Sequence, residues 1–172
     1  INGKTVDLGT ILCHGDEVNF WNFEDPQGKE VYWHTSAHVL AQAVLRIWPD
    51  AKPTIGPPIE NGFYYDFANL RISDADFAKI EKEMQSIISA NNFSQREELA
   101  SKKDALRIFA DNPYKCELNH GFEEGSTLSA YRQGEFFDLC RGPHLHNLGK
   151  IKALKILKTA GAYWRGDAKN EM

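Results

Sequence analysis

Two short motifs could bring imidazole and thiol groups together. His34 and His38 stand four residues apart, so on a helix both side chains project from one face. Roughly a hundred residues later, Cys140 and His144 bound the sequence Cys-Arg-Gly-Pro-His at the end of a predicted strand. The alternative is that these residues form no functional site and are a pair of partly exposed helix histidines and a buried cysteine.

The chemistry open to these four residues includes metal binding and hydrolysis. Two histidines, a cysteine and a third histidine form a legitimate tetrahedral zinc set, and a thiol near imidazoles can ionise to a nucleophile. The spacing is unusual for a structural zinc motif, and the helix lacks the internal Glu of a metalloprotease. Spacing alone therefore leaves a zinc site and a metal-free site equally open.

Other polar residues could complete such a site. Asp138 lies two positions before Cys140, so in a strand both side chains share a face, and the carboxylate could orient a histidine or bind a polar substrate group. Arg141 could pair with a phosphate or, more simply, with a neighbouring carboxylate. Judged by local sequence alone, Lys115 fits an exposed lysine and Tyr65 fits a core residue.

Three helices are predicted from good helix formers and from apolar residues that recur every three or four positions. The first covers about residues 33–48 and carries both histidines. The second runs from 74 to about 90, and Ser73 with Asp76 three residues later marks its start. The third covers about 101–110.

Short strands and turns account for most of the remaining sequence. Strands are predicted at 114–118 and 135–140, and the Asn-Gly pair at 61–62 predicts a hairpin. Residues 1–27 are typical of short strands with turns, and the Asp, Pro and Gly residues within 24–29 indicate a boundary. Together the elements predict an α+β fold in which helices pack on a mostly antiparallel sheet.

Composition predicts one main folded domain in the cytoplasm. The chain has 172 residues, 42% of them hydrophobic and 12% aromatic, which suffices for a core. No stretch approaches about eighteen apolar residues, and the N-terminus lacks the pattern of a signal peptide, so no membrane association is expected. Three cysteines at no regular spacing argue against a disulfide framework and for a reducing compartment.

The charge distribution is uneven. A net charge of -4 argues against a protein whose main task is to grip a nucleic-acid backbone. The segment from Arg141 to Met172 is nevertheless basic, with seven Lys and Arg residues against two acidic ones. A basic end fits contact with the tip of a nucleic acid, although a solvated face is the commoner meaning of such a run.

Longer motifs carry a resemblance to a known family. Residues 34–43 and 138–144 together resemble the paired signature of the editing domain of threonyl- and alanyl-tRNA synthetases. Two further segments, 55–66 and 158–167, resemble the threonyl branch closely. The resemblance covers about residues 30–172, and motifs of this length rarely match by chance.

The resemblance also implies a division of the chain. Residues 1–27 are similar to the C-terminal half of the small ubiquitin-like (TGS) domain that precedes editing in this family. The implied parts are a partial TGS segment at 1–27 and a tRNA editing domain at 28–172. In the family the aminoacylation core follows the point where this sequence stops, so the fragment is expected to edit but not to charge tRNA.

The function that the resemblance implies is proofreading, the hydrolysis of serine from mischarged tRNA(Thr). The implied cleft lies between the histidine helix and the sheet and receives the 3′-terminal adenosine with its esterified amino acid. Carried over by motif position, the catalytic residues are His34, Lys115 and His144, and the substrate-binding residues are His38, Tyr65, Asp138 and Cys140.

Cofactors and partners follow from the same resemblance. Editing is expected to need no metal, and zinc at His34, His38, Cys140 and His144 is the lesser alternative because alanyl-type relatives hold a metal there. ATP belongs only to the aminoacylation core. The expected partner is the 3′ end of tRNA(Thr) carrying serine, with a monomeric fragment and a homodimeric full-length enzyme. Two rivals are a zinc-dependent alanyl-type deacylase and a non-catalytic tRNA-binding module.

Overall fold

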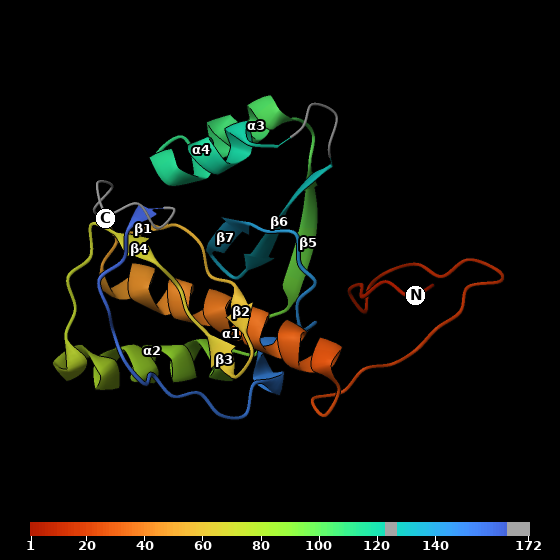
Figure 1. Ribbon diagram of the computed structural model, residues 1–172, viewed down its shortest axis with the longest axis horizontal. Helices are drawn as coiled ribbons and strands as arrows, with labels where there is room; N and C mark the ends of the chain where they lie inside the picture. The colour runs from red at the N-terminus through yellow and green to blue at the C-terminus, as the bar shows by residue number, and fades with distance from the viewer. Residues whose placement is uncertain (123–126, 165–172) are drawn as a thin grey trace.

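The computed structural model describes residues 1–122 and 127–164, and the fold in these ranges is α+β as predicted (Figure 1). Four α-helices are combined there with short strands that pair only in antiparallel fashion. The two longest helices, α1 and α2, pack side by side, and a three-stranded sheet lies against α1 on the side away from α2. No helix among the described residues is long and apolar enough to cross a membrane.

Helix α1, Pro26–Ile47, is the central element of the fold. Its predicted body is confirmed, but its start lies about seven residues earlier than predicted, inside the segment interpreted as a boundary. Pro26 occupies the first helical position, where a missing N–H costs nothing and the fixed φ suits the helix. Thr35 to Val39 and Ala41 to Val44 are buried, so this helix is covered on most of its circumference.

Helix α2, Phe77–Ser89, follows a 3₁₀ turn at Asp74–Asp76. The predicted start is confirmed in its capping interaction, because the backbone N–H of Ser73 donates to the Asp76 carboxylate at 2.9 Å. The main core lies between α1 and α2. Its buried members are Val39, Ala43, Val44, Ala51, Ile80, Met84, Ile87, Ile88, Leu148 and Ile151.

The three-stranded sheet has the order β5-β6-β7, with β5 at Ser94–Leu99, β6 at Leu128–Gln133 and β7 at Phe136–Leu139. Strand β7 confirms the strand predicted at 135–140. Strand β5 pairs with β6 along its whole length, with Ser94 opposite Gln133 and Leu99 opposite Leu128. Neither β5 nor β6 was predicted from the sequence.

Two smaller antiparallel pairs accompany α1. Strand β2, Pro58–Ile59, pairs with β3, Gly62–Phe63, which confirms the predicted hairpin at 61–62. Strand β1, Lys52–Pro53, pairs with β4, Phe67–Ala68.

Helices α3, Lys102–Ile108, and α4, Pro113–His120, form a pair beyond the sheet (Figure 1). Helix α3 confirms the third predicted helix. The strand predicted at 114–118 is wrong, because these residues belong to α4. The Asn112 side chain caps this helix by accepting hydrogen bonds from the N–H groups of Tyr114 and Lys115, and Pro113 fills the first helical position.

Residues 1–25 extend from one side of the molecule (Figure 1). The short strands predicted there are wrong, since the structure assigns turns but no strand to this segment. Alternating side chains define a strand face, but a strand also needs a paired neighbour, and here single contacts such as Asn2 N–H to the Glu17 carbonyl at 2.9 Å replace a ladder. The domain division at 27/28 stays a prediction.

A polar network ties α1 to the turn between β6 and β7. Gln42 accepts a hydrogen bond from Gln133 at 2.9 Å and donates one to Glu135 at 2.9 Å. Arg46 on the next turn of α1 pairs with the same Glu135 carboxylate at 2.6 Å, and this interaction holds the pKa of Glu135 at about 2. The network fixes the position of β7 relative to the helix that carries the two histidines.

Candidate active site

The structure brings the two sequence motifs together. His34 and His38 lie one turn apart on α1, while Cys140 and His144 follow the end of β7. One ligand atom from each of the four residues lies within 4.8 Å of all the others. The chain after β7 is fixed to α1 by a hydrogen bond from the Leu145 N–H to Thr35 Oγ1 at 2.9 Å, which places His144 beside both helix histidines.

Cys140 lies between two of the imidazoles. Its Sγ is 3.2 Å from His34 Nε2 and 3.4 Å from His144 Nε2, and it accepts a hydrogen bond from the Gly142 N–H at 3.3 Å. Burial raises the pKa of the Cys140 thiol to about 12. The thiol is therefore protonated near neutral pH, which disfavours a role as a thiolate nucleophile.

The three histidines are neutral at physiological pH. Burial lowers the pKa of His34, although the nearby carboxylates of Asp138 and Asp7 act in the opposite direction. Burial lowers the pKa of His38 and His144 well below the usual value, and the proximity of the other imidazoles lowers it further because two of them cannot easily be protonated together. His38 and His144 are each only 3% exposed, whereas His34 is partly exposed. A neutral imidazole can accept a proton, so His34 combines basicity with access from solvent.

A second group of polar residues lies next to the histidines. Lys115 on α4 and Asp138 on β7 form an ion pair of 2.7 Å, and both side chains are only 4% exposed. Tyr65 donates its hydroxyl hydrogen bond to the other Asp138 oxygen, and Lys115 Nζ is 3.3 Å from the same hydroxyl. The expectation of an exposed lysine at 115 is wrong, because the first turn of α4 directs this side chain inward.

Tyr65 joins the polar group to the core. Its ring belongs to a small buried cluster with Ala37, Ala41 and Phe136, which confirms the interpretation as a core residue. The ring also lies directly against Gly56, where an added Cβ would stand 2.2 Å from a ring carbon. Glycine at position 56 is therefore required for the ring to reach Asp138.

All seven residues predicted for the site lie in one continuous cluster. The His38 ring is 6.2 Å from the Tyr65 ring between centroids, and this contact connects the imidazoles with the Lys115, Asp138 and Tyr65 group. Asp138 and Cys140 both reach the cluster from the same strand end, as their two-residue spacing predicted. The roles assigned to the individual residues remain predictions.

The four-residue cluster matches a zinc site by residue type. His38 Nδ1 is buried and lacks a hydrogen-bond partner in the described structure, which suits a polar ligand or an ion. Bond lengths of about 2.0 to 2.3 Å place tetrahedral ligands roughly 3.3 to 3.8 Å apart, so the 4.8 Å spread would have to contract. Binding would also require Cys140 to lose its proton.

Two residues beside His144 were missed by the sequence reasoning. Ser94 Oγ on β5 lies 3.3 Å from His144 Nδ1, and the Tyr131 ring on β6 stacks on the imidazole at 4.1 Å between centroids. Both residues lie on strands that the sequence did not predict, so no local pattern marked them. Part of the threonyl-type motif, residues 165–167, lies outside the described residues.

Comparison with known proteins shows which proteins this chain resembles. Residues 128–172 match the family described as threonyl and alanyl tRNA synthetase second additional domain. The chain is 73% identical over 172 residues to the threonine–tRNA ligase of Protochlamydia amoebophila (strain UWE25), covering 100% of this chain and 26% of the ligase. It is 53% identical over 171 residues to that of Chlamydia pneumoniae, covering 99% of this chain and 27% of the ligase. Identity to the threonine–tRNA ligase of Caldanaerobacter subterraneus subsp. tengcongensis is 50% over 174 residues, again covering 99% and 27%.

Residues 128–172 are therefore similar to the second additional domain of threonyl and alanyl tRNA synthetases. Over 99 to 100% of its length, the chain is similar to threonine–tRNA ligases. The chain spans about a quarter of the length of the curated relatives that it matches.

Proposed function

We propose that this chain removes serine from mischarged tRNA(Thr) by hydrolysis, as the editing part of a threonyl-tRNA synthetase. The observation that carries the proposal is the buried Lys115–Asp138 ion pair beside three neutral imidazoles. Asp138 and the three histidines lie in the motifs that carry the family resemblance. The proposal includes a partial TGS segment at 1–27 and an editing domain at 28–172. Helix α1, which carries both histidines, begins at Pro26, close to this proposed boundary.

A synthetase for threonine needs such an activity for a physical reason. Serine lacks only one methyl group, and a pocket distinguishes a missing methyl by about 1 to 3 kcal/mol, which limits discrimination to roughly 10- to 200-fold. A second pocket that fits serine closely can reject threonine by steric exclusion of the extra methyl group. Editing therefore provides the discrimination that binding in the synthetic site cannot.

The proposed reaction is direct attack of water on the aminoacyl ester. His34 accepts a proton from water as the hydroxide adds to the carbonyl carbon, and the Lys115 ammonium stabilises the negative charge that develops on the carbonyl oxygen. The ester C–O bond then breaks, and the ribose oxygen leaves with the proton. His144, whose ring is neutral and borders Cys140, is the third proposed catalytic group, and the protonated Cys140 argues for a route without a thioester.

Asp138 can bind the amino acid even though it is already paired. An ionised carboxylate offers about four acceptor positions, and Lys115 and the Tyr65 hydroxyl occupy two of them. The remaining positions suit the ammonium or hydroxyl group of the seryl moiety. His38, Tyr65 and Cys140 would then form the walls that set the size of the pocket.

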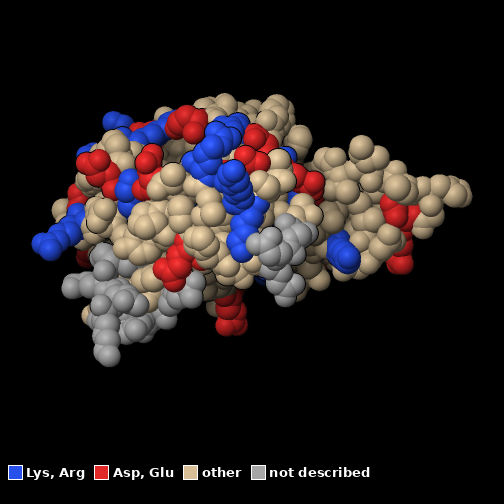
Figure 2. Space-filling model, turned by 90° about the horizontal axis from the view of Figure 1, so that it is seen from above, with Lys and Arg blue, Asp and Glu red and all other residues tan. Residues whose placement is uncertain are grey.

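Contact with tRNA is supported by charge at the surface. Arg141 is exposed next to Cys140, its guanidinium lies 5.2 Å from the centre of the Phe122 ring, and within the described part of the chain it forms no ion pair. A guanidinium fixed in this way presents a fork of donors that matches a phosphate. Figure 2, which views the molecule from the side on which α3 and α4 lie in Figure 1, also shows a run of Lys and Arg side chains with Asp and Glu side chains beside it.

We propose that editing proceeds without a bound metal. If zinc did bind, His34, His38, Cys140 and His144 would hold it, and four protein ligands would leave no position for water, which is the pattern of a structural rather than a catalytic site. ATP would act only in the aminoacylation part of the ligase. We also propose cytoplasmic location, a monomeric fragment and a homodimeric full-length enzyme.

The experiment is serine release from seryl-tRNA(Thr) with and without a chelator. Serine release at the same rate with and without the chelator supports editing without a bound metal. Loss of release on chelation favours the zinc-dependent alternative, which alanyl-tRNA(Ala) as a second substrate would then test. Retention of tRNA by the chain without any hydrolysis would favour the binding module and contradict the proposal.

A further inference from the structure

The carboxylate of Asp7 reaches from the N-terminal segment to the back of the active site. Its Oδ1 accepts a hydrogen bond from the backbone N–H of His144 at 3.0 Å. Its Oδ2 accepts one from the Tyr131 hydroxyl at 2.6 Å. One side chain thus bridges the loop that carries His144 and the strand that carries Tyr131, across sequence separations of 137 and 124 residues.

Tyr131 connects Asp7 with the His144 imidazole, because its hydroxyl donates to Asp7 and its ring stacks on the imidazole. The Tyr131 side chain is 0% exposed, and its ring lies nearly parallel to the imidazole at 19° and 4.1 Å. The hydroxyl end is enclosed by Gly142, where an added Cβ would stand 1.9 Å from the oxygen. Gly142 also has φ +68, which glycine adopts without strain. The phenol ring is therefore held between a tight loop and the histidine it supports.

The His144 ring is held both by other rings and by polar contacts, and the His34 and His38 rings lie 4.6 Å and 4.3 Å from it between centroids. Its Nδ1 meets Ser94 Oγ at 3.3 Å, which is long for a hydrogen bond to oxygen, and its Nε2 meets Cys140 Sγ at 3.4 Å. The stack with Tyr131 supplies a flat surface, and the short Asp7 hydrogen bonds fix both the phenol and the backbone at position 144. Without the carboxylate, a buried hydroxyl and a buried N–H would each lose a partner.

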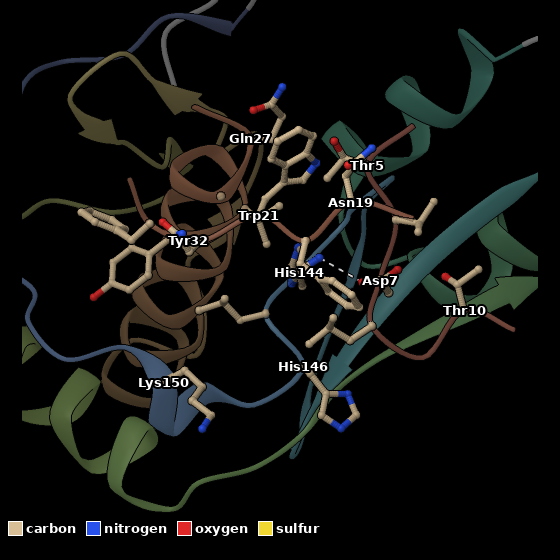
Figure 3. Close-up of a pocket in the computed structure, with 18 of the residues that line it drawn as sticks. Thr5, Asp7, Thr10, Asn19, Trp21, Gln27, Tyr32, His144, His146 and Lys150 are labelled. Atoms are coloured by element: carbon tan, nitrogen blue, oxygen red, sulfur yellow. Dashed lines mark hydrogen bonds between the residues drawn. The ribbon is translucent and has the colours of Figure 1, made fainter. Parts of the chain in front are cut away.

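The N-terminal segment is built to present Asp7. Asn2 closes the segment on itself by bonding to Asp16 at 2.7 Å and to the Glu17 N–H at 2.9 Å. Within the described residues, two hydrogen bonds join residues 1–23 to the chain beyond α1, and the Asp7 carboxylate accepts both. Figure 3 shows Asp7 and His144 joined across the wall of a cavity of about 710 Å³ between the segment and the body.

We infer that Asp7 is a positioning residue for the active site, holding Tyr131 and the loop of His144 so that the imidazole faces Cys140 and the ester. This inference rests on the proposed editing function. The N-terminal segment then contributes to hydrolysis, because its Asp7 carboxylate is the acceptor for the Tyr131 hydroxyl and the His144 N–H.

The test compares Asp7→Asn, Tyr131→Phe and the double variant in serine release from seryl-tRNA(Thr). Asp7→Asn keeps the size but turns one acceptor into a donor, and Tyr131→Phe keeps the stacked ring and removes only the hydroxyl. Each is expected to lower kcat by about tenfold with little change in KM, because misplacement affects the transition state more than binding. The double variant should lose no more than Asp7→Asn alone, since the hydrogen bond that Tyr131→Phe removes is one of the two that Asp7→Asn perturbs.

A spectroscopic measurement detects the hydrogen bond between the His144 N–H and Asp7 independently of catalysis. In the ¹H–¹⁵N spectrum of the chain, the His144 amide resonance is expected to move upfield in Asp7→Asn and to stay in place in Glu17→Gln. Glu17 is an exposed carboxylate of the same segment, whose side chain forms no hydrogen bond in the described structure, so it is the matched control. Should Asp7→Asn fail to fold, Tyr131→Phe alone decides through kcat.

The outcomes separate this inference from the proposed function. An active wild-type chain whose kcat stays within about twofold in Asp7→Asn and Tyr131→Phe overturns the role of Asp7 alone. A wild-type chain that binds tRNA and releases no serine overturns the proposed function and, with it, this role. Loss of kcat in both variants together with the shifted His144 amide supports the inference.

Discussion

Replacing Lys115 by Met would remove the charge that pairs with Asp138 while keeping most of the side-chain volume. Both side chains are only 4% exposed, so the change leaves a carboxylate buried without its counter-charge. Breaking a buried ion pair in this way costs about 3 to 5 kcal/mol of unfolding free energy. Because Tyr65 still donates to Asp138, we expect a loss near the lower end, about 3 kcal/mol.

The assay is urea unfolding of the chain followed by circular dichroism. With a slope of about 2 kcal/mol per M, a loss of about 3 kcal/mol lowers the urea midpoint by about 1.5 M. Lys103→Met on the neighbouring helix is the matched control, since Lys103 is exposed, and it should change stability by less than about 0.5 kcal/mol. The double variant Lys115→Met, Asp138→Leu should recover much of the loss, because it removes both charges.

The reasoning would be refuted by two results. A loss below about 1 kcal/mol for Lys115→Met would show that the pair behaves like an exposed ion pair. A double variant as unstable as the single one would show that packing, and not the uncompensated charge on Asp138, determines the cost.

Three further predictions follow from the same geometry. Burial lowers the pKa of His38 below its unfolded value, so the unfolded chain binds the proton first and the free energy of unfolding decreases as the pH falls below about 6.5. The urea midpoint should therefore fall between pH 7.5 and 5.5, and it should fall less in His38→Gln. Iodoacetamide at pH 8 should alkylate exposed Cys13 and spare Cys140, whose pKa is raised to about 12, and equal labelling by mass spectrometry would contradict this. Gly56→Ala should lower the thermal midpoint by several degrees, since its Cβ would overlap the Tyr65 ring, and an unchanged midpoint would show that the ring can move aside.

The sequence predicted the helices better than the strands. Apolar residues at three- and four-residue steps marked α1 and α2, and only the start of α1 was misplaced, because Pro26 resembles a turn former and acts as a first helical residue. Strand β5 was missed because Ser94–Leu99 is mostly polar and gains its order from pairing with β6. The α4 segment was mistaken for a strand, although the Asn112 cap supplied a helix start signal.

The site was predictable where the motif was local. The spacing of His34 and His38 placed both on one helix face, and the two-residue step from Asp138 to Cys140 placed both on one strand face. The Lys115–Asp138 pair had no signal in spacing, and only the family resemblance pointed to Lys115. Contacts such as Asp7 to Tyr131, separated by 124 residues, depend on tertiary packing and have no counterpart in a sequence pattern.

The central claim is that this site hydrolyses the seryl ester and excludes the threonyl ester. The most direct measurement compares the single-turnover rates of amino acid release from seryl-tRNA(Thr) and threonyl-tRNA(Thr) by the same preparation of the chain. We predict that serine is released at least about tenfold faster, because the β-methyl of threonine does not fit the pocket beside Asp138. Equal rates for the two esters, or faster release of threonine, would contradict the claim.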